Sequence, residues 1–479
     1  MNDQRSKLSR MPTPQATSRP IDLPVLFGVA VLAWWPLLIG RPLVADDFFN
    51  GPLVGEGFAA YWHKYGIWRS IGHPLPFLLR ETIPFGDSLL AIATHLVTVI
   101  LFHLSLRRLV VSRPINLAAT FFLAAMPFGF QALTWDSALS FALSTAFCLG
   151  VFFVVLHPID RAARAVAVGV SCGILGFLSL CSNEATLLLI PWIALYPVVR
   201  AWLRNDQAAA DRSSCWPALL TGLITLAFAV TWLGLHYVTK DAGFHKNPTF
   251  HAAALVSGLF RQSHQVTYLI HLPKLGAWLP ATAWWSALGV CGLMVLILRS
   301  VKPAAPRRLR WPEAFLFAIL PIAAVAIYAL GGGFSTDARK AYVIWPFLLI
   351  AAAFFLQSMS SRIQFTSLAF AAICCPVFLL STHAATRIWS QTGTLFESAY
   401  RKIREEKIAG PHQFVWQPNV YETWPSFETV CGFRFDTPWV VETAVGERPK
   451  RTDSTPAILS YSRDRMTWEV TGQTRGDGR

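Results

Sequence analysis

The chain has 479 residues, of which 54% are hydrophobic and only 14% are charged. A soluble globular protein carries about 25% charged residues, so this composition excludes an ordinary soluble domain and indicates a surface that faces lipid. The formal net charge of +14 would point to nucleic acid in a soluble protein. Here the basic residues lie mostly in short loops between apolar runs, so we expect no nucleic-acid partner.

Apolar runs recur along most of the chain, and several approach the ~20 residues that a helix needs to cross a bilayer. They predict an all-α polytopic membrane protein with about 11 transmembrane helices. The first run is too long, and lacks a clean small-residue cleavage site, for a removed signal peptide. The expected spans are residues 23–40, 87–106, 115–130, 137–156, 165–180, 185–199, 216–237, 275–298, 314–330, 341–356 and 363–380.

The charges of the loops give this arrangement an orientation. With a cytoplasmic N-terminal tail (1–22), every inner loop carries Arg or Lys. The short outer loops at 131–136 and 181–184 carry none, and the one at 331–340 carries two. This distribution follows the positive-inside rule. It predicts an integral plasma (inner) membrane protein with a transmembrane domain over 23–381 and an extracytoplasmic C-terminal domain over 382–479.

Three outer segments are long. Residues 41–85 contain an aromatic stripe over 58–68 that suits a helix lying in the interface, or equally one packed against protein. Residues 238–274 contain four histidines and an expected interfacial helix over 251–271. The tail after 382 is more polar, and we expect a helix at 395–407 and short strands at 414–416, 430–435, 439–445 and 466–470, which together indicate a small α/β domain.

Candidate functional residues gather on the predicted outer side. They are Asp46 and Asp47, Asp136, Glu184, Arg339 and Lys340, with His63 and His73 in the first outer segment. Each has a structural alternative. The aspartate pair suits a solvated turn or a cap for the following helix, Asp136 an N-cap, and Glu184 a favourable position at a helix N-terminus. Arg339 and Lys340 suit side chains that reach the interface from a span end, and loop histidines suit ordinary interfacial residues.

Glycosyl transfer from a lipid phosphate would use these residues together. An acceptor hydroxyl or amine needs a carboxylate as general base, which Asp46 or Asp47 would supply. The departing polyprenyl phosphate needs cations that stabilise its developing charge, which Arg339 and Lys340 would supply.

The motif Ala45-Asp46-Asp47-Phe48 follows a first span in a long outer loop, and this layout resembles the GT-C membrane glycosyltransferases. That group includes the protein O-mannosyltransferases and the aminoarabinose transferases that modify lipid A. The segments at 127–144 (PFGFQALTWDSALSFALS), 180–185 (LCSNEA) and 339–342 (RKAY) are similar to further parts of such enzymes.

The resemblance implies an inverting transfer of a hexose or pentose from a polyprenyl-phosphate donor to a glycan, lipid or protein acceptor of the cell envelope. It implies a catalytic role for Asp46 or Asp47, with Asp46 the marginal choice by motif alignment. Asp136 would be a second acidic group near the acceptor, Glu184 a supporting carboxylate and Arg339 a phosphate ligand. Some members use a divalent metal near the first loop and others do not, so the cofactor stays open, with His63 and His73 available.

A transporter or flippase of lipid-linked saccharides is the alternative function. Such a protein places ionisable residues near the middle of the membrane and often shows two repeated halves. The spans hold only His95 and His103 as isolated titratable groups, and we find no internal repeat. A non-enzymatic scaffold that displays the C-terminal domain would leave the outer acids unexplained.

Overall fold

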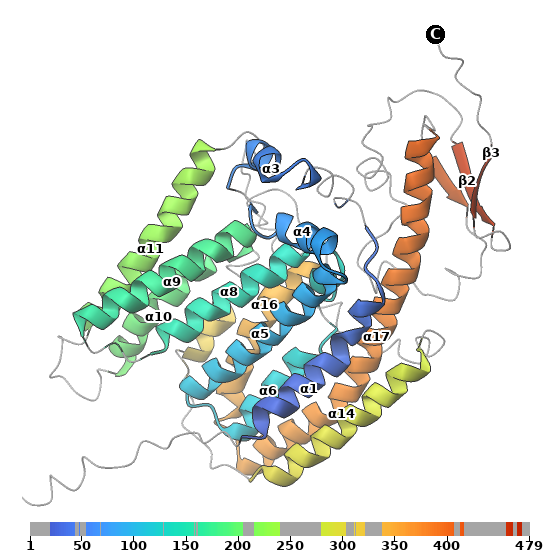
Figure 1. The fold of residues 1–479 in the computed structure, drawn as a ribbon. Coiled ribbons are helices and arrows are strands. Elements are labelled where there is room, and N and C mark those ends of the chain that lie inside the picture. Colours follow the sequence, from blue (N-terminus) through green and yellow to red (C-terminus); the bar gives the residue numbers. More distant parts are fainter. Residues whose placement is uncertain are drawn as a thin grey trace, which may run out of the picture.

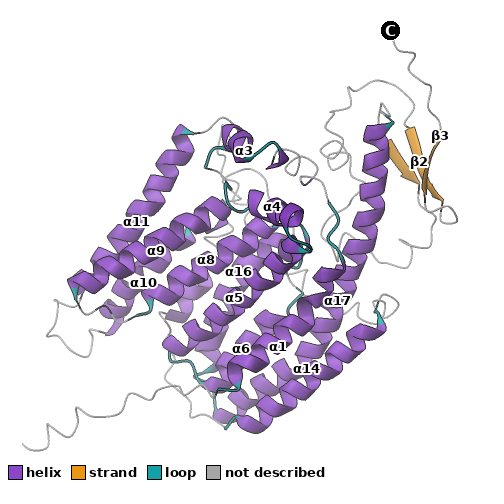
Figure 2. Ribbon diagram, in the orientation of Figure 1, coloured by secondary structure: helices purple, strands orange, loops and turns teal. Residues whose placement is uncertain are grey.

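Long apolar helices make up most of the chain that the structure describes (Figure 1). The structure, a computed structural model, describes residues 20–43, 47, 54–67, 69–127, 129–157, 159, 161–204, 215–239, 279–302, 311, 313–320, 338–406, 412–415, 457–462 and 467–471. Helices dominate these ranges, and three short strands follow the last helix (Figure 2).

The elements in chain order are α1 (Asp22–Trp34), the 3-10 turn η2 (Trp35–Ile39), α3 (Phe58–Tyr65), α4 (Pro74–Thr82), α5 (Gly86–Arg108), α6 (Arg113–Ala125), α7 (Gln131–Thr134), α8 (Leu139–Val155), α9 (Ala162–Ser182), η3 (Glu184–Thr186), α10 (Leu189–Arg204), α11 (Cys215–Val238), α14 (Ala281–Ser300), α16 (Ala338–Leu356), α17 (Ser361–Glu405), β1 (His412–Val415), β2 (Ala457–Ser462) and β3 (Thr467–Thr471).

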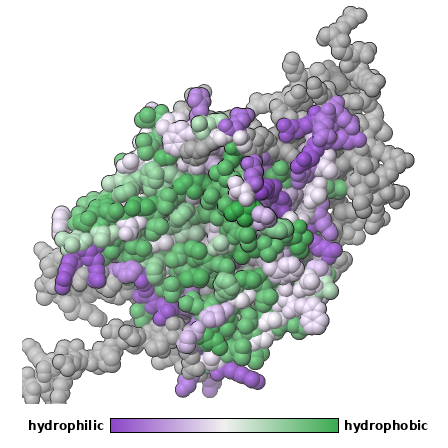
Figure 3. All heavy atoms as spheres, in the orientation of Figure 1, coloured by the Kyte–Doolittle hydropathy of each residue, from purple (hydrophilic) through white to green (hydrophobic). Residues whose placement is uncertain are grey.

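Seven helices in the described ranges are long and apolar enough to cross a bilayer: α1 with η2, α5, α9, α11, α14, α16 and α17. The apolar helices α8 and α10 are shorter. Hydrophobic side chains cover the middle of the bundle, and hydrophilic ones gather toward its two ends (Figure 3). The prediction of a polytopic α-helical membrane protein is therefore confirmed.

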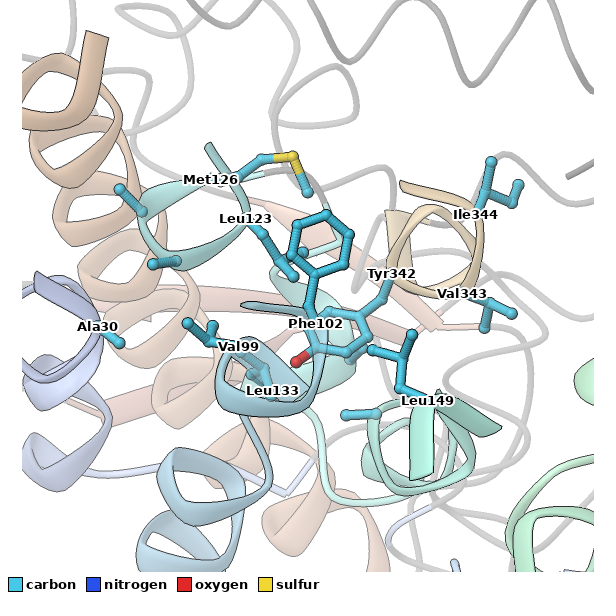
Figure 4. Packing of buried hydrophobic residues seen from close by; sticks show 14 of the residues in the cluster. Ala30, Val99, Phe102, Leu123, Met126, Leu133, Leu149, Tyr342, Val343 and Ile344 are labelled. Atoms are coloured by element: carbon cyan, nitrogen blue, oxygen red, sulfur yellow. The ribbon is translucent and has the colours of Figure 1, made fainter. Parts of the chain in front are cut away.

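Helix α8 lies at the centre of the bundle, where most of its side chains are buried. It contacts α5, α9, α10 and α16. In Figure 4, Tyr342 of α16 and Phe102 of α5 lie close together, with Leu149 of α8 beside them. One continuous hydrophobic core runs through these helices and on to α1, α6 and α17.

Helix α17 is a single helix of 45 residues. The sequence predicted a span at 363–380 and a separate helix at 395–407, so the expected boundary at 382 falls inside a continuous helix. The helix continues because its apolar face stays buried past that point, at Ile388, Trp389 and Phe396. The His383 ring also bonds the carbonyl of Leu32 at 2.8 Å, which ties this part of α17 to α1.

The three strands form one sheet in the order β1-β2-β3. Strand β1 pairs parallel to β2, and β2 pairs antiparallel to β3. Strands β1 and β3 overlap two of the expected strands, whereas β2 was not predicted. The strands expected at 430–435 and 439–445 lie outside the described residues, as does the interfacial helix expected at 251–271.

The aromatic stripe in the first outer segment forms helix α3, which ends before Gly66 (φ +59°). Tyr61 is fully buried and Trp62 is 38% exposed, so the helix packs one aromatic side chain against protein and leaves the other accessible. Helices α3 and α4 lie at the same end of the bundle (Figure 1), which we call the α3–α4 end.

Candidate active site

Asp47 is fully buried, and three hydrogen-bond donors converge on its Oδ1. The indole N–H of Trp135 donates to Oδ1 at 3.1 Å. The backbone N–H and the hydroxyl of Ser137 donate to the same oxygen at 2.9 and 2.5 Å. Three donors on one oxygen compensate for the desolvation of the carboxylate and fix its orientation. The structure thus brings Asp47 against the turn between α7 and α8, whose Trp135 lies 88 residues further along the chain.

Trp135 also carries a guanidinium on its ring face. The Cζ of Arg339 lies 4.5 Å from the Trp135 ring centroid and 5.6 Å from that of Phe141. Contacts of this kind stabilise a cation by about 0.5–2 kcal/mol. One indole therefore bonds the carboxylate of Asp47 through its edge and supports the guanidinium of Arg339 on its face.

Asp136, between Trp135 and Ser137, belongs to a buried network of two carboxylates and two guanidinium groups. Its oxygens lie 2.8 Å from Arg41 Nη1 and 2.9 Å from Arg80 Nη2. Arg80 also makes two bonds to Asp87 Oδ2, at 3.0 and 2.8 Å. The side chain of Asp136 does not cap α8, so the N-cap alternative is wrong; Asp136 pairs with arginines instead.

The charges of this network raise the pKa of Arg80. Burial alone would lower it, but the nearby carboxylates of Asp136 and Asp87, and more weakly Asp47, outweigh that effect. Arg80 thus stays cationic throughout the accessible pH range.

Glu184 pairs with Arg69 in a two-bond arrangement. Arg69 Nε and Nη2 donate to the two carboxylate oxygens at 2.9 and 2.6 Å, the fork geometry that arginine and carboxylate favour. The third guanidinium nitrogen, Nη1, lies 3.2 Å from His73 Nε2. Glu184 therefore does more than occupy a helix N-terminus, because it joins the start of η3 to the loop before α4.

That loop is held closely against the bundle. Arg69 adopts a left-handed backbone conformation (φ +50°), which costs a non-glycine residue of order 1 kcal/mol and persists only where contacts stabilise it. The N–H of Ile71 donates to the carbonyl of Cys181 at 3.1 Å. A Cβ on Gly72 would collide with the carbonyl of Ser182 and the side chain of Ser140, so this position requires glycine.

His73 is neutral in this setting. Its ring is 3% exposed, and burial holds its pKa well below the usual value; the positive charges of Arg69 and Arg339 lower the pKa further. A neutral imidazole accepts hydrogen bonds on one nitrogen, which suits its place beside the Arg69 guanidinium.

The remaining predicted residues lie as follows. Lys340 is buried (5% exposed) next to Arg339 in the first turn of α16, so it does not simply extend from a span end toward the interface. His63 is exposed on α3. Asp46 and the histidines of segment 238–274 lie outside the described residues.

The groups around Asp47 and Asp136 do not fit a metal ion. Asp47 Oδ1 faces three hydrogen-bond donors and Asp136 faces two guanidinium groups. Within the described ranges, no three His, Cys, Asp or Glu side chains come close enough together to hold a metal.

Six site residues were not predicted, namely Arg41, Arg69, Arg80, Asp87, Trp135 and Ser137. The first three are basic residues in the predicted outer segment 41–85, where the positive-inside rule would leave few. This departure from the positive-inside pattern is a signal that could have found the three arginines.

The assembled site offers an oriented carboxylate, a cation on an aromatic face and a buried polar surround at one end of a membrane bundle. A carboxylate can accept a proton from a hydroxyl or amine. A guanidinium can stabilise a departing phosphate.

Fold and site together define a polytopic helical membrane protein with a charged site at one end of its helical bundle. The chain matches no protein-family profile, and no curated protein matches it in sequence. Among solved structures it is similar to ArnT from Cupriavidus metallidurans in the apo state, at 14% identity and a TM-score of 0.48, covering 88% of this chain and 84% of that one.

It is also similar to the archaeal oligosaccharyltransferase AglB from Archaeoglobus fulgidus, in complex with an inhibitory peptide and a dolichol-phosphate. The identity is 14% and the TM-score 0.45, with 89% of this chain and 64% of AglB covered, so the chain spans less than two thirds of AglB.

Proposed function

We propose that this protein is an inverting membrane glycosyltransferase. It moves a hexose or pentose from a polyprenyl-phosphate donor to a glycan, lipid or protein acceptor of the cell envelope. The reaction takes place at the outer face of the plasma membrane, with the N-terminus in the cytoplasm and the α3–α4 end outside.

The observation that carries the proposal is the double contact of Trp135. Its N–H bonds the carboxylate of Asp47 and its face holds the guanidinium of Arg339. A general base and a phosphate ligand must lie on either side of the anomeric carbon in a single displacement, so they must be close without neutralising each other. The indole of Trp135 lies between the Asp47 carboxylate and the Arg339 guanidinium and contacts both, so the two groups are close and the ring separates them.

In this mechanism the carboxylate of Asp47 or Asp46 takes the proton of the acceptor as the acceptor oxygen or nitrogen attacks the anomeric carbon. The bond from that carbon to the phosphate oxygen breaks, and its electron pair leaves with the polyprenyl phosphate. Arg339 and Lys340 stabilise the resulting charge. Attack from the face opposite the departing phosphate inverts the configuration.

The other polar residues support the site. Glu184 and His73 fix Arg69 beside Phe141, whose ring also carries Arg339. The contacts of Asp136 with Arg41 and Arg80 favour a place behind Asp47 over one facing the acceptor. His63, exposed on α3, is available to an acceptor at the surface.

Transport of a lipid-linked saccharide is supported less well. Of the titratable residues predicted inside spans, His95 joins α5 to α16 and α6 through the Tyr342 hydroxyl at 2.8 Å and the carbonyl of Ala124 at 3.0 Å. A group that ties three helices together is suited to packing rather than to a moving pathway.

The experiment has two parts. Mass analysis of cell-envelope glycans with and without the protein should show the loss of one sugar modification, and the purified protein should transfer that radiolabelled sugar from polyprenyl phosphate. Arg339→Ala should then raise the KM for the donor more than the KM for the acceptor, while Arg362→Ala, at the opposite end of the bundle, serves as the control. Movement of the intact lipid-linked saccharide across vesicles, without transfer, would favour the transporter instead.

A further inference from the structure

The turn between α7 and α8 is held from two sides by alternate residues. Thr134 and Asp136 bind Arg41, through the Thr134 carbonyl at 3.4 Å and the Asp136 carboxylate at 2.8 Å. Trp135 and Ser137 donate to Asp47. Residues 134–137 thus contact both Arg41 and Asp47. Because Thr134 and Asp136 alternate with Trp135 and Ser137 along the chain, a shift of the first pair also moves the two residues that donate to Asp47.

Arg80 connects this turn to the rest of the site. Its Nη2 lies 2.9 Å from Asp136 Oδ2 and 2.8 Å from Asp87 Oδ2, and it donates to the carbonyl of Arg41 at 2.5 Å. One guanidinium from α4 therefore bonds the turn, the start of α5 and the segment that leads to Asp47.

The four charges of this network balance. Two guanidinium groups face two carboxylates, and the side chains of Arg41 and Asp136 are 1% and 0% exposed. Without Arg80, Asp136 and Asp87 would share the single cation of Arg41, at 2.8 and 3.8 Å. Two buried carboxylates facing one cation are not balanced, so we expect the turn 134–137 to shift.

We propose that Arg80 is a positioning residue: through Asp136 and the turn 134–137 it sets the place of the Asp47 carboxylate, without touching donor or acceptor. The kinetic consequences of this proposal rest on the proposed function, whereas the structural coupling between Arg80 and Asp47 does not. Misplacing a catalytic group by about 1 Å can cost 10²-fold in rate, and that is the effect we expect from losing Arg80.

Steady-state kinetics separate positioning from substrate binding. Arg80→Gln should lower kcat about 10²-fold and leave both KM values within about twofold. Arg80→Lys keeps a cation beside both carboxylates but loses the fork, so it should recover part of kcat. A selective rise in donor KM for Arg80→Gln, or no recovery in Arg80→Lys, would overturn the proposal.

Arg113 offers a matched control. It makes a two-bond pair with the buried Asp22, at 3.0 and 2.6 Å, between the N-terminal ends of α6 and α1. Arg113→Gln removes a comparable buried ion pair, so it should lose stability while kcat per folded molecule stays unchanged.

A double-mutant cycle tests the coupling without any activity. The thermal midpoints of Asp47→Asn, Arg80→Gln and the double variant should be clearly non-additive, whereas Asp47→Asn and Arg113→Gln should be additive. Additivity in both cycles would overturn the positioning role. Lack of sugar transfer by the unaltered protein would instead count against the proposed function and leave the cycle intact.

Discussion

Arg339 lies over the indole of Trp135, with its guanidinium carbon 4.5 Å from the ring centroid, while the N–H of the same indole donates to Asp47. Residues from the first loop, the α7–α8 turn and α16 therefore meet at a single side chain. The indole has two separable functions, a hydrogen bond at its edge and a cation contact on its face, and substitutions can remove them one at a time.

Trp135→Phe keeps an aromatic face under Arg339 and removes the donor to Asp47. A hydrogen bond to a charged group contributes about 1.5–3 kcal/mol, so we expect kcat to fall roughly 10- to 100-fold with little change in donor KM. Trp135→Leu removes the face as well and should raise donor KM in addition. Steady-state kinetics with the sugar donor measure both.

Trp34→Phe is the control for this pair of variants. Trp34 is buried and donates to the carbonyl of Ala124 at 3.2 Å, so its loss removes a similar indole bond away from the site and should leave both constants unchanged. If Trp135→Phe and Trp135→Leu raised the donor KM equally, the two functions of the indole would not be separable.

Arg69→Gln removes the two-bond partner of Glu184. The Glu184 side chain is only 9% exposed, and leaving a buried charge without its partner costs about 3–5 kcal/mol. We expect a cost at the lower end of that range, because the side chain of Arg69 is partly exposed. We expect a clear fall in the thermal midpoint of the protein in detergent. Arg401→Gln, which breaks a pair whose arginine is 60% exposed, should cost under about 1 kcal/mol. Equal losses in the two variants would contradict the argument.

His73 makes stability depend on pH in one direction. Its folded pKa lies well below the usual value because the ring is buried beside Arg69 and Arg339. Below about pH 6.5 the unfolded chain binds a proton at this residue that the folded protein does not. Stability therefore falls as pH falls from about 6.5 toward the folded pKa, by up to about 1.4 kcal/mol per pH unit.

Thermal midpoints measured between about pH 7.5 and pH 5 test this, because that range brackets the ordinary histidine pKa of about 6.5. His73→Gln should flatten the decline relative to the unaltered protein. His63→Gln changes an exposed ring and should leave the slope as it is. A slope unaffected by His73→Gln would refute the assignment.

Much of the helical fold could be predicted because a bilayer demands apolar runs of a fixed length. Each expected span contains helix within the described residues, from α1 at 23–40 to α17 at 363–380. The extension of α17 past 382 could not be predicted, since Ser381, Thr382 and His383 look like the end of a span. All three are buried, and Thr382 and His383 bond α6 and α1, which only the packed structure shows.

The sequence singled out candidate residues but none of their contacts. Asp47, Asp136, Glu184 and Arg339 were chosen because charged residues at span ends need an explanation, and their roles stay predictions. Their partners Arg41, Arg69 and Arg80 are ordinary basic residues of the outer segment 41–85 until folding pairs them with carboxylates. The position of Trp135 between Asp47 and Arg339 depends on three distant segments, and no local pattern encodes it.

Asp47→Asn tests the central claim most directly. The amide keeps the size of the side chain and removes its ability to take a proton, so the variant should insert, fold and bind the donor normally, yet lose transfer of radiolabelled sugar from polyprenyl phosphate by at least about 10²-fold. Asp46→Asn, made in parallel, shows which of the two carboxylates takes the proton. Full transfer by the double Asp46→Asn, Asp47→Asn variant would contradict the account.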